Sequence, residues 1–530
     1  MNDAAAVTSE KRRREEPLAA GAAASASKMR RRDKPEPQEA PASADDEDAT
    51  LDRISELPAD ILGSILSLLP TKEAARTAVL SSAWRDTWRS APLNLAVDDD
   101  LAGQERNRIT AVSEILASHR GPVRRLSLDT IRLGRDRFAR FDGWFRSPAL
   151  DGLEELNFYG DGTQPRLPPP RPLPLPPSAL RFGPTLRAAS IGGCDFPQID
   201  AAPVLSFPKL KRLKLYDVCI SEAALHGLLA GCTVLERLHL QDIYGFSTVR
   251  IISPTLRCIG VSVCPMNEEH TFQELVIEDA PCLERMMQVG PVVPGKIKVI
   301  AAPKLTVLGY VSTEMHKLLI GTLILKENIP IPFTGSACTV KILVLGPSSS
   351  NGEAFVEFLR CFPCLEKLCI QSYLEKVRES GTLVDPINCL DLHLREIVLN
   401  GYRGNKRNVN FAKFFILNAR VLKVMKFGVS GNCDEKWISN QREQLHLDNR
   451  ASTDAQFYFG RDDVTYPFYI GRDYVPYPFF YNEHIYGLQS DGDRKKLPEG
   501  SSALQQKVVR AHDAARAAPA GGLPILFFQY

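Results

Sequence analysis

Apolar residues recur along most of this 530-residue chain in one spacing, L-x-x-L-x-L, with charged or polar residues at many of the positions between them. The second half of each copy alternates apolar and polar residues, which is the period of a β-strand with one face in a core. Successive copies lie about 20 to 30 residues apart, with shorter steps near residues 260–290. The copies are Val123–Leu128, Leu153–Phe158, Leu210–Leu215, Leu235–Leu240, Leu256–Ile259, Leu305–Leu308, Leu365–Ile370, Leu394–Leu399 and Leu422–Phe427. We expect one short strand for each copy.

Some segments between these copies have the pattern of short helices. Ser221–Ala230 places apolar residues at helical spacing behind a capping serine, and Gly352–Cys361 has a similar pattern. Strand and helix units repeated at this period resemble leucine-rich repeats, in which no unit folds alone. The resemblance implies a solenoid over residues 120–387 with its strands lining a concave face. The irregular steps predict uneven curvature and locally broken helices. Strands of ordinary α/β domains are the alternative interpretation.

A different pattern occupies residues 51–95, where apolar residues recur at the spacing of short amphipathic helices. The first stripe consists of Leu57, Ile61, Leu62, Ile65, Leu68 and Leu69. Pro70 ends this helix, Thr71 can cap the next, and Ser81 or Ser82 can begin a third. Three such short helices form a unit too small to be stable alone. We therefore expect apolar surface that a partner protein covers.

Residues 51–95 resemble the F-box family, through Leu57-Pro58, the run Leu68–Arg76, Val79-Leu80-Ser81 and the pair Trp84 and Trp88. In that family the module binds the SKP adaptor of a cullin–RING ubiquitin ligase. The resemblance assigns the adaptor-binding face to Leu57, Pro58, Ile61, Leu62, Ile65, Leu68, Val79, Leu80 and Trp84. The chain departs from the family at Ser82-Ala83, where two basic residues are usual. The alternative is a three-helix part of a larger core.

Residues 388–458 resemble the FBD module that follows leucine-rich repeats in many plant F-box proteins. The resemblance rests mainly on Leu394–Gly404, Phe411–Arg420 and Val421–Met425, which read as strand, amphipathic helix and strand. Such a unit can cap the open end of a solenoid. Beyond it, Gly460–Tyr469 is nearly repeated by Gly471–Phe480, and residues 459–530 receive no assignment.

The N-terminal residues 1–50 contain almost no aliphatic or aromatic side chains, so we expect them to be disordered. Two basic clusters in this tail have the spacing of a bipartite nuclear import signal, with a plain solvated tail as the alternative. The clusters consist of Lys11, Arg12, Arg13 and Arg14, and of Lys28, Arg30, Arg31 and Arg32. We expect the protein in the nucleus, the cytoplasm or both.

Composition and charge exclude several classes of function. The net charge of +2 argues against a protein with a strongly basic surface for nucleic acid. No run of about 18 apolar residues predicts a membrane-spanning helix, and we expect no membrane partner. The N-terminus lacks the apolar stretch of a secretory signal, so the 12 cysteines are expected to be reduced.

Two local motifs could carry other functions. Cys361 and Cys364 form a C-x-x-C that could be redox-active or half of a zinc site, although Pro363 also fits a repeat head. The proline-rich segment Pro165–Pro177 should form an exposed polyproline II helix, either a plain loop or an SH3 ligand. No phosphate-binding loop, H-E-x-x-H or nucleophile elbow occurs, so we expect no catalytic residue, cofactor or metal.

The expected fold class is therefore α/β: a small three-helix F-box, an irregular leucine-rich-repeat solenoid and a disordered N-terminal tail. The resemblance implies a substrate-recognition subunit of an SCF-type ligase. Its partners would be a SKP-type adaptor, a cullin bound through that adaptor, and an unidentified target protein. A repeat scaffold without any ligase role is the alternative.

Overall fold

The computed structural model describes residues 54–461, apart from internal gaps. The gaps are 55–56, 68, 70, 97–104, 129–130, 132–136, 160–172, 198–204, 264–272, 289–294, 312–316, 327–328, 331–334, 346–351, 372–386, 430 and 432. The expectations for the N-terminal tail, for its basic clusters and for nearly all of residues 459–530 lie outside the described residues.

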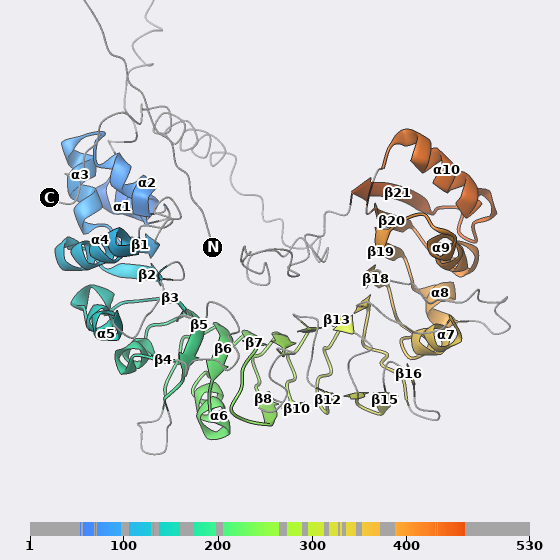
Figure 1. The fold of residues 1–530 in the computed structure, drawn as a ribbon, viewed down its shortest axis with the longest axis horizontal. Coiled ribbons are helices and arrows are strands. Elements are labelled where there is room, and N and C mark those ends of the chain that lie inside the picture. Colours follow the sequence, from blue (N-terminus) through green and yellow to red (C-terminus); the bar gives the residue numbers. More distant parts are fainter. Residues whose placement is uncertain are drawn as a thin grey trace, which may run out of the picture. The chain divides into compact units, whose positions relative to one another are not determined.

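Three short helices open the described chain, as the sequence predicts (Figure 1). They are α1 (Ala59–Leu66), α2 (Thr71–Thr77) and α3 (Ser82–Ser90). Both α1 and α2 pack against α3. The short strand β1 (Leu93–Ala96) follows at once and pairs with the first strand of the repeat array.

One long parallel sheet runs through the rest of the described chain (Figure 1). In spatial order its strands are β1, β2 (Val123–Ser127), β3 (Glu155–Tyr159), β5 (Ala188–Asp195), β6 (Arg212–Cys219), β7 (Arg237–Gln241), β9 (Cys258–Ser262), β11 (Arg285–Gln288), β13 (Val307–Val311), β17 (Ile342–Leu345), β18 (Lys367–Gln371), β19 (Glu396–Tyr402), β20 (Val424–Val429) and β21 (Gln456–Arg461). The strand β4 (Leu173–Pro174) pairs with β5 outside this series. Every predicted L-x-x-L-x-L copy contributes to one of these strands.

The repeat spacing sets the register of the sheet. The second apolar position of each copy aligns with its counterpart in the next strand, so that Leu213 pairs with Leu238 and Leu238 with Ile259. The same column continues through Leu308, Leu343 and Leu368 in later strands. Because alternate residues of a strand point to one face, this register brings all these side chains into a single core.

Apart from β4, five described strands of the sheet lack a predicted copy, namely β1, β5, β11, β17 and β21. Small or β-branched residues replace leucine in some of them, as with Ala189 and Gly192 in β5. Gly192 lies where strands approach closely, because an added Cβ would come within 2.6 Å of the Tyr159 ring. In β5, the absence of the leucine pattern is thus a result of close local packing.

Helices form the second layer near both ends of the array (Figure 1). They are α4 (Glu105–Ser118), α5 (Phe138–Phe145), α6 (Glu222–Ala230), α7 (Gly352–Arg360), α8 (Asn388–Leu392), α9 (Lys406–Asn418) and α10 (Glu435–Leu445), with 3-10 turns η4 (Pro148–Leu150), η5 (Pro177–Phe182) and η6 (Leu447–Asn449). Ser221 caps α6 by accepting a hydrogen bond from the Ala224 N–H at 3.2 Å, as predicted.

A second sheet replaces these helices in the middle of the array. Its strands are β8 (Thr248–Ile252), β10 (Glu274–Asp279), β12 (Lys296–Val299), β14 (Lys317–Ile320), β15 (Leu323–Lys326) and β16 (Ile329–Pro330). The sequence predicted broken helices here but not strands. These segments alternate like strands, as Val249 and Ile251 are buried while Arg250 and Ile252 are exposed. Between α6 and α7, the described residues contain no helix.

The proline-rich segment differs from its prediction in its described part. Residues 165–172 lie outside the described residues, whereas Leu173-Pro174 forms β4 and Pro177 begins η5. The Leu175 side chain is only 1% exposed, because it packs into the array core. The expected exposed polyproline II helix is therefore wrong for residues 173–177.

A continuous apolar core extends from β1 to the C-terminal end of the array, from Leu93 to Ala455. The three helices have a separate small core of their own. Among the described residues, no helix combines the length and apolar character needed to cross a bilayer.

Candidate functional site

The local sequence fixes where each of the three N-terminal helices begins and ends. Pro58 precedes α1, and its carbonyl accepts hydrogen bonds from Ile61 and Leu62 N–H at 2.9 and 3.1 Å. The Ser81 hydroxyl accepts a hydrogen bond from the Trp84 N–H at 3.3 Å and so caps α3. A tight turn between α2 and α3 holds Val79 and Leu80. The capping residues therefore determine which side chains the turn presents.

The core of this three-helix module is small. It consists of the buried side chains Leu62, Leu66, Ala74, Trp84 and Ala91, with Ile54, Leu57, Leu69 and Trp88 packed against them. A core of this size contributes little stability alone. The module is also held to the array through Trp88, whose ring lies 5.4 Å from the His119 ring.

Three large apolar side chains of the module face solvent. Ile61 is 48% exposed, and Val79 and Leu80 are each 64% exposed. Pro58, which directly precedes α1 and lies three residues before Ile61, is also exposed. Exposed aliphatic side chains in so small a unit make it a candidate surface for binding another protein. This set, Pro58, Ile61, Val79 and Leu80, is called the exposed apolar set below.

The structure divides eight of the nine residues assigned to adaptor binding into three groups: exposed, half-buried and buried. Pro58, Ile61, Val79 and Leu80 are exposed, and Leu57 and Ile65 are half-buried. Leu62 and Trp84 are 3% and 6% exposed because they form the module's own core. Leu68 lies outside the described residues. Only the first two groups offer surface to a partner without unfolding the module.

The connection between the module and the array is a feature that the sequence did not reveal. The Thr71 hydroxyl donates to the Asn94 carbonyl and accepts from the Ala96 N–H at 3.1 Å, which ties α2 to β1. The Leu93 N–H donates to the Pro122 carbonyl at 2.9 Å. The alternation in Leu93-Asn-Leu-Ala was the available signal for β1.

Ion pairs join the residues that directly precede several array strands. Glu236 accepts from Lys211 at 2.8 Å and Glu284 from Arg257 at 2.6 Å. Glu366 accepts from Lys341 at 2.8 Å in the same way. These residues occupy the first polar position of the L-x-x-L spacing, so the register that aligns leucines also aligns opposite charges. Exposed pairs of this kind each contribute about 0–1 kcal/mol.

A polar cluster lies on the face of β6 and β7 opposite the core. Lys214 and His239 pair in register, and the Lys214 ammonium lies 5.7 Å from the centre of the Tyr216 ring. Burial, and to a lesser extent Lys214, holds the pKa of His239 well below its usual range. Burial lowers the pKa of Lys214 as well. His239 itself is fully buried, so only the half-buried Lys214 offers surface here.

Two aspartates complete this cluster at equivalent places in neighbouring repeats. Asp217 and Asp242 both have φ of 52°, in the left-handed region that few residues other than glycine adopt. Gly193 occupies the corresponding position in the preceding repeat, with φ of 61°. Burial, and to a lesser extent Asp217, raises the pKa of Asp242 to about 6. The repeat geometry thus holds two carboxyl groups close together.

The C-x-x-C motif lies at the head of β18. Burial raises the pKa of the Cys361 thiol to about 11, so the thiol is protonated at neutral pH. Its sulfur donates to the Glu357 carbonyl at 3.5 Å. Within the described ranges, no group of three or more histidine, cysteine, aspartate or glutamate side chains could hold a metal ion.

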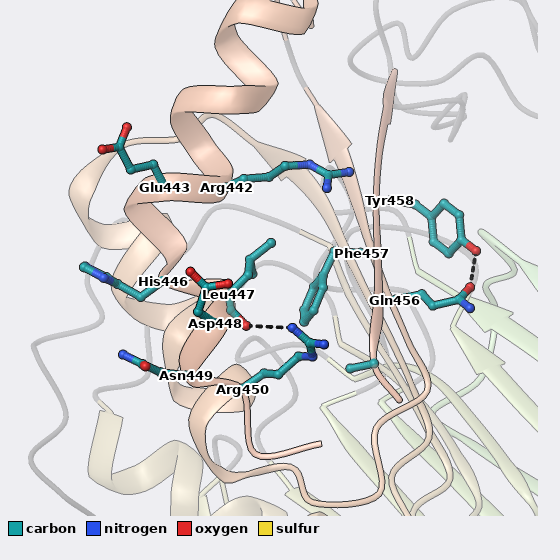
Figure 2. Close-up of a pocket in the computed structure, with 11 residues that line it drawn as sticks. Arg442, Glu443, His446, Leu447, Asp448, Asn449, Arg450, Gln456, Phe457 and Tyr458 are labelled. Atoms are coloured by element: carbon teal, nitrogen blue, oxygen red, sulfur yellow. Dashed lines mark hydrogen bonds between the residues drawn. The ribbon is translucent and has the colours of Figure 1, made fainter. Parts of the chain in front are cut away.

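A hollow of about 950 Å³ lies at the C-terminal end of the array (Figure 2). Its lining comes from α10, η6 and β21: Arg442, Glu443, His446, Leu447, Asp448, Asn449, Arg450, Ala455, Gln456, Phe457 and Tyr458. The Arg450 guanidinium donates to the Leu447 carbonyl at 3.2 Å and to the Thr453 carbonyl at 3.3 Å. Because the lining contains both acidic and basic side chains, it does not indicate the charge of a ligand.

Three family models match the chain in the order of these structural regions. The F-box domain matches residues 54–95, the model described as "FBD-associated F-box protein At5g56370, LRR repeats" matches residues 141–370, and FBD matches residues 384–427. The chain therefore carries regions similar to an F-box, leucine-rich repeats and an FBD module, in that order.

Relatives in Arabidopsis thaliana include two whose names print the same three modules and one named for the F-box and repeats alone. The putative F-box/FBD/LRR-repeat protein At3g49030 is 26% identical over 428 residues, covering 74% of this chain and 91% of the relative. F-box/FBD/LRR-repeat protein At3g26920 is 26% identical over 445 residues, covering 77% and 96%. F-box/LRR-repeat protein At4g14103 is 32% identical over 246 residues, covering 44% and 60%.

The F-box is thus the three-helix module, and its combination with leucine-rich repeats indicates a role in protein interaction. The FBD model covers β19 and α9, whose order of strand and helix the sequence predicted. These elements continue the sheet of the repeats through parallel pairing of β18 with β19 and of β19 with β20. The FBD module therefore shares the array core.

Proposed function

We propose that this protein is the substrate-recognition subunit of an SCF-type cullin–RING ubiquitin ligase. The F-box binds a SKP-type adaptor, and through it a cullin, while the repeats bind a target protein. The observation that carries this proposal is the exposure of Ile61, Val79 and Leu80 on a module with a very small core. Covering such side chains contributes about 1.5–3 kcal/mol each.

The adaptor-binding face consists of the exposed apolar set, with Leu57 and Ile65 at its border. Leu62 and Trp84 act indirectly, because they hold the three helices in place. This division separates the residues that touch the adaptor from those that position them. Interface energy is usually concentrated in a few such apolar side chains.

The repeats hold the target protein in place, while other subunits of the ligase catalyse the transfer of ubiquitin to it. The half-buried residues Lys214 and Asp242, beside the fully buried His239, are our proposed part of the target surface. Holding a target lysine near the conjugating enzyme raises its effective concentration. The protein itself then needs no catalytic residue and no cofactor.

Adaptor capture tests the proposal. The full chain and the double variant Val79→Asp/Leu80→Asp are each incubated with immobilised SKP adaptor. Two charges placed at the interface should reduce binding at least tenfold without altering the melting temperature. The matched control is Ile252→Asp, which changes a 69% exposed side chain on β8 and should bind normally. Undiminished binding of the double variant would refute the adaptor-binding face.

A scaffold without ligase function is the second candidate. The departure from the F-box family at Ser82 favours it, because this exposed residue stands where basic side chains are usual. The two candidates differ in cullin association. Recovery of a cullin together with the adaptor-bound chain supports the ligase, and adaptor binding without a cullin supports the scaffold.

A further inference from the structure

One carboxylate on the face opposite the array core lies between two arginines from other strands. Glu155 in β3 pairs with Arg212 in β6 at 2.9 Å and with Arg125 in β2 at 3.7 Å. The next residues along β2 and β3, Leu126 and Leu156, belong to the core, which places the charged side chains on the opposite face. The negative charge is therefore shared by two cations within the chain.

The same arrangement recurs near the C-terminal end of the array. Glu396 in β19 pairs with Lys426 in β20 at 3.0 Å and with Lys367 in β18 at 3.2 Å. Burial alone would raise the pKa of Glu396, but the hydrogen bonds and charges of the two lysines outweigh burial and lower this pKa. At both places, one acidic side chain joins two basic side chains from other strands.

A third pair of basic side chains flanks a cysteine instead of an acidic residue. Arg237 in β7 and Arg285 in β11 are each in register with Cys258 in β9, the strand between them. The residues that follow the two arginines, Leu238 and Met286, are buried in the core, so the arginines lie on the opposite face. Their Cα atoms are about 10 Å apart, because neighbouring strands are spaced by about 4.8 Å. Two long side chains can reach one ligand across that distance.

The cysteine does not supply a negative charge to this pair. Burial raises the pKa of Cys258 to about 11, although both guanidinium groups lie close enough to lower it, so the thiol is neutral at pH 7. The acidic residues that directly precede β7 and β11 pair with other cations. Glu236 accepts from Lys211 at 2.8 Å, and Glu284 accepts from Arg257 at 2.6 Å. Two guanidinium groups thus lie beside a neutral side chain.

The surroundings of this pair favour a single small anion. Arg212 is in register with Arg237 and adds a third guanidinium beside it. On the other side, Val307 is in register with Arg285 and is buried. The carboxyl group of Asp242 belongs to the far end of β7, where its Cα is roughly 16 Å from that of Arg237 at about 3.3 Å per residue. Guanidinium groups bind carboxylate and phosphoryl oxygens through paired hydrogen bonds, and so few of them do not match the long phosphate backbone of nucleic acid.

We propose that Arg237 and Arg285 together bind one acidic side chain of the target protein, a carboxylate or a phosphorylated residue, beside Cys258. That side chain takes the place that Glu155 occupies in the first arrangement. The inference rests on the proposed function in naming the target protein as the partner. Adaptor capture is a separate measurement on the three-helix module. A chain that binds the adaptor but none of the acidic probes would therefore refute this inference alone.

Protection of arginines from phenylglyoxal tests this binding in the full chain. The reagent modifies accessible guanidinium groups, and mass spectrometry of the digested chain reports each arginine separately. The probes are inorganic phosphate and three capped pentapeptides in which phosphoserine, glutamate or serine is flanked by glycines. The phosphoserine or the glutamate peptide should slow the modification of Arg237 and Arg285 at least threefold, and the serine peptide should not. Arg250, whose side chain is 60% exposed and pairs with Glu278 on the second sheet, is the reference and should keep its rate.

Three variants, each first shown by circular dichroism to be folded, sharpen the result. Arg285→Gln should abolish the protection of Arg237, because one guanidinium holds the anion weakly. Arg125→Gln is the matched control, since it removes an arginine from the Glu155 arrangement and should leave the protection unchanged. Cys258→Asp places a carboxylate between the two guanidinium groups, so both arginines should react slowly without any peptide.

Three results would overturn the proposal. Equal modification rates with all three peptides, or equal protection of Arg250, would show that the pair does not bind an acidic side chain specifically. Protection of Arg237 that persists in Arg285→Gln would show that the two arginines do not act together. Protection by inorganic phosphate alone would show that the pair binds a free anion and not a side chain of a protein. If both acidic peptides protect, the one that does so at the lower concentration identifies the preferred acidic group.

Discussion

The F-box module and the repeat array differ in how completely they bury their apolar side chains. The array shares one core along its whole length, so that a residue such as Leu238 is packed between neighbouring strands on both sides. The module has a core of a few residues, and it leaves Val79 and Leu80 in solvent. The array thus buries its own apolar side chains, whereas the module leaves apolar surface that, in the proposed function, a partner covers.

The largest expected effect comes from the module's core. Trp84→Ala removes the largest side chain from that small core and should cost about 3–5 kcal/mol. Because the remaining core cannot absorb this loss, α1 to α3 should unfold while the array stays folded. Amide exchange resolved by segment would show rapid exchange of residues 59–90 alone. Simultaneous loss of array protection would contradict a separate module core.

A substitution in the array core should destabilise the whole array. Leu238→Ala removes a fully buried side chain at the centre of the leucine column and should destabilise the array by about 2–5 kcal/mol. Urea unfolding followed by circular dichroism measures this change. Ile252→Ala, at a 69% exposed position, is the matched control and should stay within about 0.5 kcal/mol of wild type.

A smaller effect is expected at the start of α3. Ser81→Ala removes the side-chain cap of this helix and should destabilise the module by about 0.5–2 kcal/mol. The adjoining turn would lose its fixed geometry, and adaptor affinity should fall with the stability of the module. Ser81→Asp retains a capping oxygen and should restore both. If Ser81→Ala left the adaptor affinity unchanged, the turn would not be part of the adaptor-binding face.

The smallest effect is a pH dependence of the array. The pKa of Asp242 is raised to about 6 in the folded chain by burial, and secondarily by Asp217. The folded state therefore holds this proton more tightly than the unfolded state, so the Asp242 contribution favours folding below pH 4 and is lost as pH rises to 6. Asp242→Asn should flatten the pH dependence of the urea midpoint between pH 4 and 6. An unchanged pH profile would contradict the burial of this carboxyl group.

Sequence reasoning succeeded where one residue pattern has one structural meaning. The copy Leu235–Leu240 becomes β7 because its alternation fits only a strand with a single buried face. It failed at β5, where Ala189 and Gly192 replace larger residues to allow close packing. The second sheet was missed because its short segments around Val249 and Ile297 lie between copies expected to enclose helices or loops.

The same limit applies to the adaptor-binding face. Ile61 and Leu62 are neighbours in one apolar stripe, and the sequence assigned both to the partner. The packing of α1 against α3 buries Leu62 and leaves Ile61 exposed. Only the arrangement of three helices distinguishes them, because a single helix stripe is wider than the surface it buries.

Hydroxyl-radical footprinting of the full chain with and without SKP adaptor tests the central claim most directly, since it reports the solvent exposure of individual side chains. The account predicts that the adaptor lowers the oxidation of Ile61, Val79 and Leu80 several-fold. Ile252, as exposed on the array, should be oxidised equally in both samples. Unchanged oxidation of the three F-box side chains in an adaptor-bound chain would contradict the account.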